Sequence, residues 1–232
     1  MNTHSVRRQK HSEKYQAILR AAIKVFAGRG FFQSTVADVA EAAGVADGTV
    51  YLYFKSKDDL LISIFNETME EVIAKSRAEL QKLDDPVERL GKLASLHLSW
   101  LGRDRQLAVV FQVELRQSTK FMEEFSTTRL AEYFEMIREI IVDGQKRGIF
   151  RQEIHPKVAT KVFFGALDEM VTNWILSRRR YSLESMVQPV TDILIKGIEK
   201  RSGKLRFSAR ARWERRSPGT WRMPACPYFC WT

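Results

Sequence analysis

Residues 35–59 read T-V-A-D-V-A-E-A-A-G-V-A-D-G-T-V-Y-L-Y-F-K-S-K-D-D, which predicts two short helices, a tight turn between them and the start of a third helix. Thr35 and Asp38 have the spacing of a capping box, in which a hydroxyl and a carboxylate satisfy free N–H groups at a helix start. Apolar residues then recur at helical spacing as far as Ala43, and Gly44 supplies the backbone freedom that a turn between packed helices needs. The stretch therefore predicts a first helix from Thr35 to Ala43 that ends in a sharp turn.

The second short helix is expected over Ala46–Phe54, and its two faces differ in character. Val50 and Phe54 are four residues apart, so both lie on the inner face. The outer face carries Asp47, Gly48, Thr49, Tyr51 and Tyr53. In a helix-turn-helix the second helix enters the major groove of DNA, and small residues such as Gly48 and Thr49 let its backbone come close. We expect this face to contact double-stranded DNA.

A longer helix is expected to begin directly afterwards. Ser56 and Asp59 form a second possible capping box, and the free N–H groups and dipole of such a helix start favour a phosphate. Lys57 would add a positive charge at the same place. The candidate DNA-binding residues are therefore Thr35, Asp47, Gly48, Thr49, Tyr51, Tyr53 and Lys57.

Three motifs in fixed order carry a family resemblance: T-V-A-D-V-A-E-A-A-G-V at 35–45, G-T-V-Y-L-Y-F at 48–54 and K-S-K-D-D-L at 55–60. They resemble the TetR family of one-component transcriptional regulators. The resemblance implies an all-α protein with a three-helix DNA-binding domain over residues 1–56. A larger helical domain for ligand binding and dimerisation would cover residues 57–201. The alternative interpretation is an ordinary three-helix cluster with a glycine turn.

The charge of the chain is concentrated at its two ends. The 232 residues carry a net charge of +10 and are 44% hydrophobic. Residues 202–232 contain seven Lys and Arg against one Glu, and residues 1–57 contain nine basic against four acidic residues. The rest of the chain is close to neutral, which suits a protein that neutralises DNA phosphates with its N-terminal domain.

The lengths of the apolar segments and the positions of the cysteines argue against a membrane-spanning protein, a secreted protein and a fold held by disulfides. No run of eighteen uncharged apolar residues occurs and no apolar segment follows Met1, so we expect a soluble, cytoplasmic protein without a membrane span. The cysteines, Cys226 and Cys230, lie close to the C-terminus, which leaves the expected folded part without a disulfide or a cysteine metal site.

Both ends of the chain are expected to be poorly ordered. Residues 1–10 are polar and basic and predict a disordered arm, followed by a helix from His11 or Ser12 to Ala27. Residues 202–232 combine Trp, Pro and Cys without helical period and depart from the family pattern. We interpret them as a non-family extension; a basic arm that binds DNA is the alternative.

Six further helices are expected in the larger domain, because apolar residues recur there at helical spacing and strand patterns are rare. They are predicted over 57–83, 86–101, 106–117, 121–146, 156–178 and 183–200. The last two carry a broad apolar stripe. In the resembling family this pair forms a four-helix dimer interface, and a homodimer would place two DNA-binding domains on a palindromic operator.

No catalytic, metal-binding or phosphate-binding pattern is present, so the sequence favours neither an enzyme nor a bound cofactor. His97 lies on an apolar helix face and is expected to be a core histidine. Arg116, Asp168 and Glu169 are polar residues on otherwise apolar helices. Two interpretations remain open: Arg116 pairs with Asp168 or Glu169 to join helices, or these groups line a pocket for a partly apolar ligand.

Within the TetR family the resemblance narrows to the FadR-type members, which sense long-chain acyl-CoA. It rests on residues 46–65, on F-Q-V-E-L-R-Q-S at 111–118 and on F-G-A-L-D-E-M-V-T-N-W at 164–174. It implies a repressor of fatty acid degradation genes that leaves its operator when acyl-CoA fills a tunnel in the larger domain.

The resemblance also suggests ligand-binding residues. The acyl chain would be lined by Leu96, Trp100, Phe111, Phe134, Phe164 and Trp174, with Asn173 among the polar groups nearby. Arg116 and the cluster Arg178 to Arg180 would meet the thioester or the phosphates. The alternatives are a repressor that senses another hydrophobic effector, and a helical DNA-binding or interaction module with no small ligand.

Overall fold

The chain forms helices throughout the part that the structure describes. This structure is a computed structural model, and it describes residues 3–117, 121, 123, 129–179 and 181–200, the first ten of these by their backbone alone. The predicted tail at 202–232, Arg180 and most of the segment before Arg129 lie outside the described residues. Within the described residues the one strand-like pairing is an antiparallel bridge between Phe150 and Glu199.

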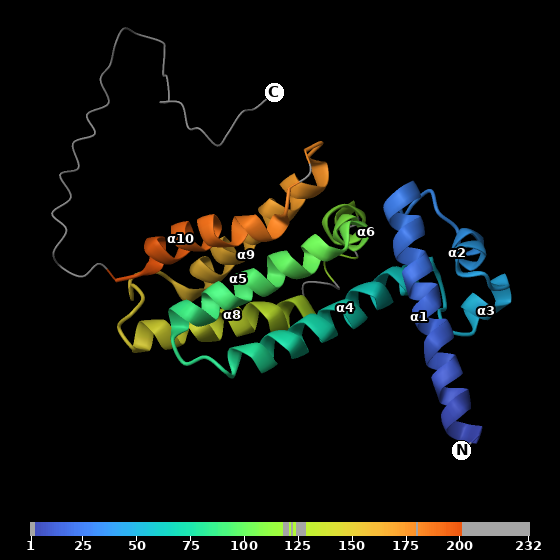
Figure 1. The fold of residues 1–232 in the computed structure, drawn as a ribbon, viewed down its shortest axis with the longest axis horizontal. Coiled ribbons are helices and arrows are strands. Elements are labelled where there is room, and N and C mark those ends of the chain that lie inside the picture. The colour runs from blue at the N-terminus through green and yellow to red at the C-terminus, as the bar shows by residue number, and fades with distance from the viewer. Residues whose placement is uncertain (1–2, 118–120, 122, 124–128, 180, 201–232) are drawn as a thin grey trace, which may run out of the picture. The chain divides into compact units, whose positions relative to one another are not determined.

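The N-terminal helices α1 (Thr3–Arg29), α2 (Val36–Ala43) and α3 (Asp47–Tyr51) form the part we call the head (Figure 1). The predicted capping box is confirmed, because the Thr35 hydroxyl accepts a hydrogen bond from the Asp38 N–H (3.1 Å) and Asp38 Oδ2 accepts one from the Thr35 N–H (2.8 Å). Gly44 ends α2 in the left-handed conformation, with φ of 67°. This geometry sets the angle between α2 and α3.

Two expectations for the head need correction. The helix α1 begins at Thr3, so the expected disordered arm is wrong for residues 3–10. No Gly or Pro occurs between Thr3 and Ala27, and nothing local therefore stops the helix from extending. The helix α3 ends at Tyr51 and not at Phe54, because the chain turns inward there to bury Phe54 before Ser56 caps the next helix.

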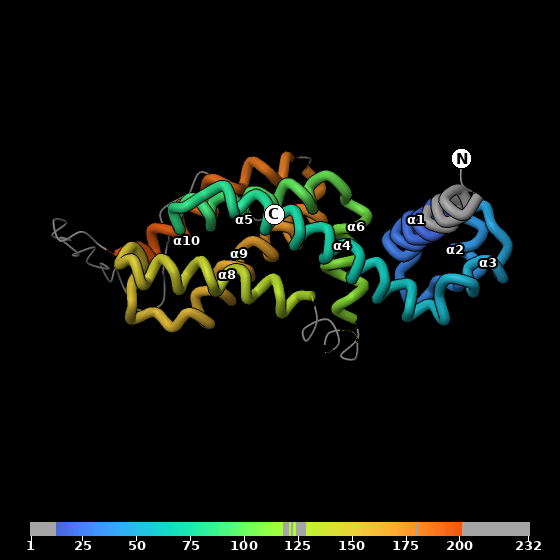
Figure 2. Tube along the Cα trace, turned by 90° about the horizontal axis from the view of Figure 1, so that it is seen from below, coloured from blue at the N-terminus to red at the C-terminus, as the bar shows by residue number. Residues whose placement is uncertain are grey.

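The helix α4 (Lys57–Leu80) joins the head to a bundle of four further helices. It contacts α1 in the head and both α5 (Pro86–Arg103) and α8 (Arg129–Lys146) in the bundle (Figures 1 and 2). The bundle is completed by α9 (Pro156–Leu176) and α10 (Val187–Ile198). The buried face of α4 includes Leu60, Leu61, Ile64 and Phe65, so one continuous apolar core extends from the head into the bundle.

Helix starts in the bundle follow the predicted caps, with one exception. Asp85 caps α5 through the Val87 N–H, and Pro86 and Pro156 occupy first-turn positions, where a missing N–H costs nothing. The exception is the last predicted helix, which begins as a 3₁₀ turn (Leu183–Met186) and becomes α-helical only at Val187. Pro189 lies in the first turn of α10, and this position is compatible with the later start.

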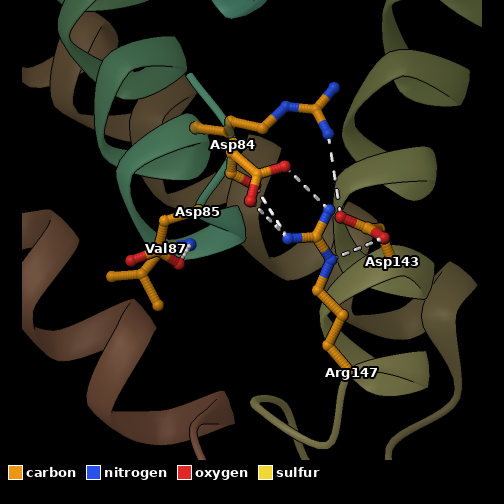
Figure 3. Close-up of polar contacts among 6 residues, drawn as sticks. Asp84, Asp85, Val87, Asp143 and Arg147 are labelled. Carbon is orange, nitrogen blue, oxygen red and sulfur yellow. Dashed lines mark hydrogen bonds and ion pairs between the residues drawn. The ribbon is translucent and has the colours of Figure 1, made fainter.

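An ion cluster ties the α4–α5 connection to the end of α8 (Figure 3). The Arg147 guanidinium donates two hydrogen bonds to the Asp84 carboxylate, at 3.0 and 3.1 Å, and a third to Asp143 (3.1 Å). These bonds hold the pKa of the Asp84 carboxyl below its usual value. Arg89 of α5 lies beside Asp143 at 3.8 Å, so the cluster fixes one end of the bundle.

The predicted helix at 106–117 is helical but not uniformly α-helical. It consists of α6 (Arg105–Val109), a π-helical turn η1 (Val110–Glu114) and a 3₁₀ turn η2 (Leu115–Gln117). π-Helical turns are rare, and they occur frequently at functional sites. In η1 the side chains of Phe111, Gln112 and Glu114 are all buried. This segment lies between the head and the bundle core, because α1 contacts both α6 and η1.

Candidate functional site

The bundle contains a cavity of about 40 Å³ beneath the π-helical turn. Side chains of α4, α5, η1, η2, α8 and α9 line it, and most of them are apolar. The lining residues are Met69, Val72, His97, Trp100, Leu101, Phe111, Gln112, Arg116, Leu130, Tyr133, Phe164 and Asp168. The cavity is therefore suited to an apolar molecule that carries a few polar groups.

One side of the cavity is polar and charged. Asp168 Oδ1 accepts hydrogen bonds from Arg116 Nη2 (2.7 Å) and Gln112 Nε2 (2.9 Å). The side chain of Arg116 is 40% exposed and that of Asp168 is 14% exposed, so this ion pair reaches the protein surface. Arg116 therefore pairs with Asp168, which was the first interpretation, and both side chains line the cavity.

His97 and Tyr133 form a buried polar pair within the apolar lining. His97 Nδ1 lies 3.1 Å from the Tyr133 hydroxyl. Burial lowers the pKa of His97 to about 4 against the opposing charge of Asp168, so the imidazole is neutral at pH 7. Burial also raises the pKa of the Tyr133 hydroxyl. His97 is a core histidine as expected, but its Nε2 is buried and has no hydrogen-bond partner among the described residues.

Four of the nine candidate ligand-binding residues line the cavity: Trp100, Phe111, Arg116 and Phe164. The other five lie outside the lining: Leu96, Phe134, Asn173, Trp174 and Arg178. Of the other eight lining residues, Met69, Val72, Leu101, Leu130 and Tyr133 are of types that also fill protein cores. No sequence pattern therefore distinguishes them from core residues. The signal that was available is the spacing of His97, Trp100 and Leu101 on one face of α5.

Several of the five outlying residues have other partners. Phe134 packs edge-on against Phe164, with ring centroids 4.9 Å apart, and the Lys161 ammonium lies 3.4 Å from its centroid. The Trp174 indole N–H donates to the Tyr181 carbonyl at 3.0 Å. The Asn173 amide donates to Glu169 on the same helix. These contacts stabilise the surroundings of the cavity.

A buried carboxylate connects the cavity segment to the head. Glu114 Oε2, at the end of the π-helical turn, accepts a hydrogen bond from the Phe31 N–H at 2.7 Å. Phe31 lies in the loop between α1 and α2, and Glu114 is 5% exposed. Bonds from a neutral donor to a charged acceptor are stronger than neutral pairs, and they are costly to break when buried. No local sequence pattern indicates this contact, because Phe31 and Glu114 lie 83 positions apart.

Lys57 holds the same loop from the other side. Its ammonium donates to the carbonyls of Phe31 and Ser34, both at 2.8 Å, and lies 4.5 Å from the centre of the Phe31 ring. The sequence interpretation placed this charge beside a DNA phosphate. In the structure the ammonium is turned inward, towards the carbonyls of the loop between α1 and α2.

The outer face of α3 is open to solvent. Asp47 and Gly48 are exposed, Thr49 is half-buried, and Tyr51 is 57% exposed. Tyr53 is half-buried, with its ring 6.1 Å from that of Tyr15 on α1. Thr35 is exposed and takes part in the capping box of α2. The candidate residues on α3 are thus exposed or half-buried.

The residues that the structure describes hold no group of three or more His, Cys, Asp or Glu side chains placed to bind a metal ion. None of the described helices combines the length and the apolar character that a bilayer crossing requires.

A helix-turn-helix head joined to a helical domain with an internal cavity defines a DNA-binding regulator with a sensing domain. Family models agree: the model for bacterial regulatory proteins of the tetR family matches residues 18–64, and that for the C-terminal region of YsiA-like proteins matches residues 65–197. The chain belongs to the TetR family of transcriptional regulators, and it is a regulator and not an enzyme. The predicted family and all-α fold class are confirmed.

The similar proteins indicate which members of the TetR family this chain resembles. The chain is 36% identical over 188 residues to the fatty acid metabolism regulator protein of Bacillus subtilis, which covers 81% of this chain and 97% of that protein. Its fold resembles that of the fatty acid degradation regulator FadR from Bacillus halodurans, with 40% identity, a TM-score of 0.76 and coverage of 79% and 95%. The crystal structure of FadR from Bacillus subtilis in complex with stearoyl-CoA has 36% identity, a TM-score of 0.76 and coverage of 79% and 99%.

Proposed function

We propose that this chain is a repressor of fatty acid metabolism genes that releases its operator when the bundle binds long-chain acyl-CoA. The observation that carries the proposal is the cavity, which is apolar along most of its lining and charged where Arg116 and Asp168 reach the surface. An acyl-CoA likewise has an apolar part and a charged part, because its acyl chain is joined to a charged and polar group. The stearoyl-CoA complex of a relative with 36% identity supports this effector. The protein would act in the cytoplasm, where DNA and acyl-CoA are found.

Binding of a long chain requires the cavity to widen. A volume of about 40 Å³ has room for about three water molecules, at roughly 10 to 15 Å³ for each. An acyl chain must therefore displace lining side chains. Phe111 and Gln112 line the cavity and lie in the π-helical turn, a geometry that occurs frequently at functional sites. We propose that the displacement falls on this turn.

The movement would reach the head through Glu114. This residue lies two positions after Gln112 in the same turn, and its carboxylate holds the Phe31 N–H of the α1–α2 loop. A shift of the turn would move or break this bond and change the orientation of α2 and α3, while α4 carries the same movement at Lys57. A coupling free energy of about 1 to 3 kcal/mol would change operator affinity roughly 5- to 150-fold.

The outer face of α3 would bind the operator. Thr49 and Tyr51 would contact base edges in the major groove, and Gly48 would let the backbone approach the DNA. Thr35, Asp47 and Tyr53 lie on or beside this surface and would contact the backbone or neighbouring groups. Lys57 would contribute by fixing the loop between α1 and α2, on which the position of α2 depends.

A homodimer would present two heads to one operator. Val158 and Val162 on α9 and Ile193 on α10 are more than half exposed, although all three are apolar. We propose that they lie in a four-helix interface between two copies. Exposed apolar residues grouped on neighbouring helices are typical of such interfaces, and two heads bind successive major grooves of a palindrome with combined affinity.

The proposal is tested by fluorescence anisotropy with the purified protein and DNA from the promoters of acyl-CoA metabolism genes. Addition of palmitoyl-CoA should weaken operator binding roughly 5- to 150-fold, whereas coenzyme A alone should leave it unchanged. Operator binding that palmitoyl-CoA does not alter would contradict the proposed effector. Failure to bind any of these promoters would contradict the proposed target genes.

A further inference from the structure

His97 lines the proposed effector pocket, and one of its ring nitrogens has no hydrogen-bond partner among the described residues. Its side chain lines the cavity and is 9% exposed, and its Nδ1 is occupied by the Tyr133 hydroxyl at 3.1 Å. Its Nε2 is buried and has no hydrogen-bond partner among the described side chains. The Phe164 ring lies edge-to-face with the imidazole at 5.8 Å, and an aromatic ring is a much weaker acceptor than an oxygen.

The pair of His97 and Tyr133 decides which nitrogen carries the proton. Burial keeps the imidazole neutral at pH 7, so one ring nitrogen is a donor and the other an acceptor. If Nδ1 accepts from the Tyr133 hydroxyl, only the Nε2–H is left unpaired. If Nδ1 instead donates to Tyr133, the hydroxyl proton and the Nε2 lone pair both lack partners. The first tautomer leaves fewer buried groups unsatisfied, and Nε2 is then a donor.

We infer that His97 is a specificity-determining residue of this pocket and that its Nε2–H donates a hydrogen bond to the neutral thioester carbonyl of the bound acyl group. The inference rests on the proposed function and assigns a position to one atom of the effector. The carbonyl would lie between the apolar lining, where the chain binds, and the Arg116–Asp168 pair, which reaches the surface.

A neutral carbonyl fits this place better than a free carboxylate. The Asp168 charge acts on His97, so an anion beside the imidazole would also meet this carboxylate. The Arg116 guanidinium already pairs with Asp168 at 2.7 Å. An uncharged acceptor satisfies the Nε2–H without burying a second negative charge, which would be costly in an apolar cavity.

The test compares two ligands that differ only at the carbonyl: palmitoyl-CoA and its thioether analogue hexadecyl-CoA. Isothermal titration calorimetry with the wild-type protein should show about a tenfold preference for palmitoyl-CoA. In His97→Leu the preference should fall to about twofold or less, because the donor is gone. His97→Gln retains an N–H donor near the same place and should retain most of the preference. Leu101→Val, a change in the apolar lining, is the matched control and should weaken both ligands equally.

The outcomes separate this inference from the proposed function. If wild-type protein binds both ligands without preference, the role of His97 is overturned while acyl-CoA sensing stands. If His97→Leu retains the wild-type preference, the carbonyl has another donor and the inference is equally overturned. If wild-type protein binds neither ligand, the proposed effector fails and the assignment of His97 fails with it.

Discussion

At the scale of single residues, His97 makes the stability of the protein depend on pH. The folded pKa of about 4 lies below the ordinary value of 6.5, because burial penalises the imidazolium. Below about pH 6.5 the unfolded chain therefore binds a proton that the folded chain does not, and stability falls as the pH drops towards 4. At about 1.4 kcal/mol per pKa unit the loss is on the order of 3 kcal/mol.

Urea unfolding of the wild type and of His97→Leu between pH 7 and pH 4 checks this expectation. The variant also loses the bond to Tyr133, but that loss is constant with pH, so the diagnostic quantity is the difference in slope. The wild type should lose on the order of 3 kcal/mol more than the variant across this range. Parallel curves would show that the His97 pKa is not lowered in the folded protein.

A second prediction at this scale concerns Gly144 in α8. A Cβ at this position would lie 2.1 Å from the Phe150 ring, which is 1% exposed and cannot move aside freely. Gly144→Ala should therefore destabilise the protein by about 1 to 3 kcal/mol or more. Gly91→Ala in α5 is the control, because no atom lies within 4 Å of the added methyl group. It should be neutral or stabilise by up to about 1 kcal/mol, and equal effects in chemical denaturation would contradict the packing argument.

At the scale of elements, the π-helical turn and the α1–α2 loop are joined by the hydrogen bond between Glu114 and the Phe31 N–H. Glu114→Ala removes the partner of the Phe31 N–H but no lining of the cavity. Palmitoyl-CoA should bind nearly as before, while its effect on operator affinity should shrink to about twofold or less. Calorimetry measures the first quantity and anisotropy the second.

Gln117→Ala is the matched control for this element. The Gln117 amide donates to the same oxygen of Glu114 at 3.2 Å, and no hydrogen bond joins Gln117 to the head among the described residues. It should retain the full response to effector. A Glu114→Ala protein that responds fully would show that the signal travels through α4 alone.

The helix α3 supports a separate prediction on DNA recognition. Thr49→Ala or Tyr51→Ala should cost about 1 to 3 kcal/mol on the preferred operator and relax the sequence preference, because these side chains would contact base edges. Tyr53→Ala should weaken binding more uniformly across sequences. Anisotropy with operators changed at single base pairs distinguishes the two patterns, and identical profiles for all three variants would contradict this division of roles.

The sequence predicts a contact when the residues that make it are close together in the sequence, and it fails when they are far apart. The capping box of Thr35 and Asp38 involves residues three apart, and it was predicted in full. The bond from Phe31 to Glu114 joins residues 83 positions apart, and no local pattern indicates it. The cavity follows the same rule, because Met69 and Leu130 look like ordinary core residues until the packing leaves a space between them.

At the scale of the whole molecule, the apolar surface of α9 and α10 would determine, in the proposed homodimer, how many heads meet the operator. Val162→Glu or Ile193→Glu places a charge on this surface, where both wild-type side chains are exposed in the single chain. Each should convert the dimer to a monomer by native mass spectrometry and weaken operator binding by roughly 100-fold, because the second head no longer adds to the first.

Ala74→Glu on α4 is the control for this charge, since Ala74 is exposed on a different helix. It should leave the mass and the operator affinity unchanged. A dimer that persists in both Val162→Glu and Ile193→Glu would place the interface on another surface.

The π-helical turn also bears on how regulators of this kind change over generations. A π-helical turn accommodates one residue more than an α-helical turn, so loss of one codon within residues 110–114 would restore regular α-helix. Side chains beyond the deletion would keep nearly the same direction, because the hydrogen bond that spans five residues in the π-helical turn would span four in the α-helix. Loss or gain of this residue therefore changes the packing around Phe111 and Gln112 without turning the segments on either side. The cavity lining can thus change in length at one place while the cores of the head and the bundle keep their sequences.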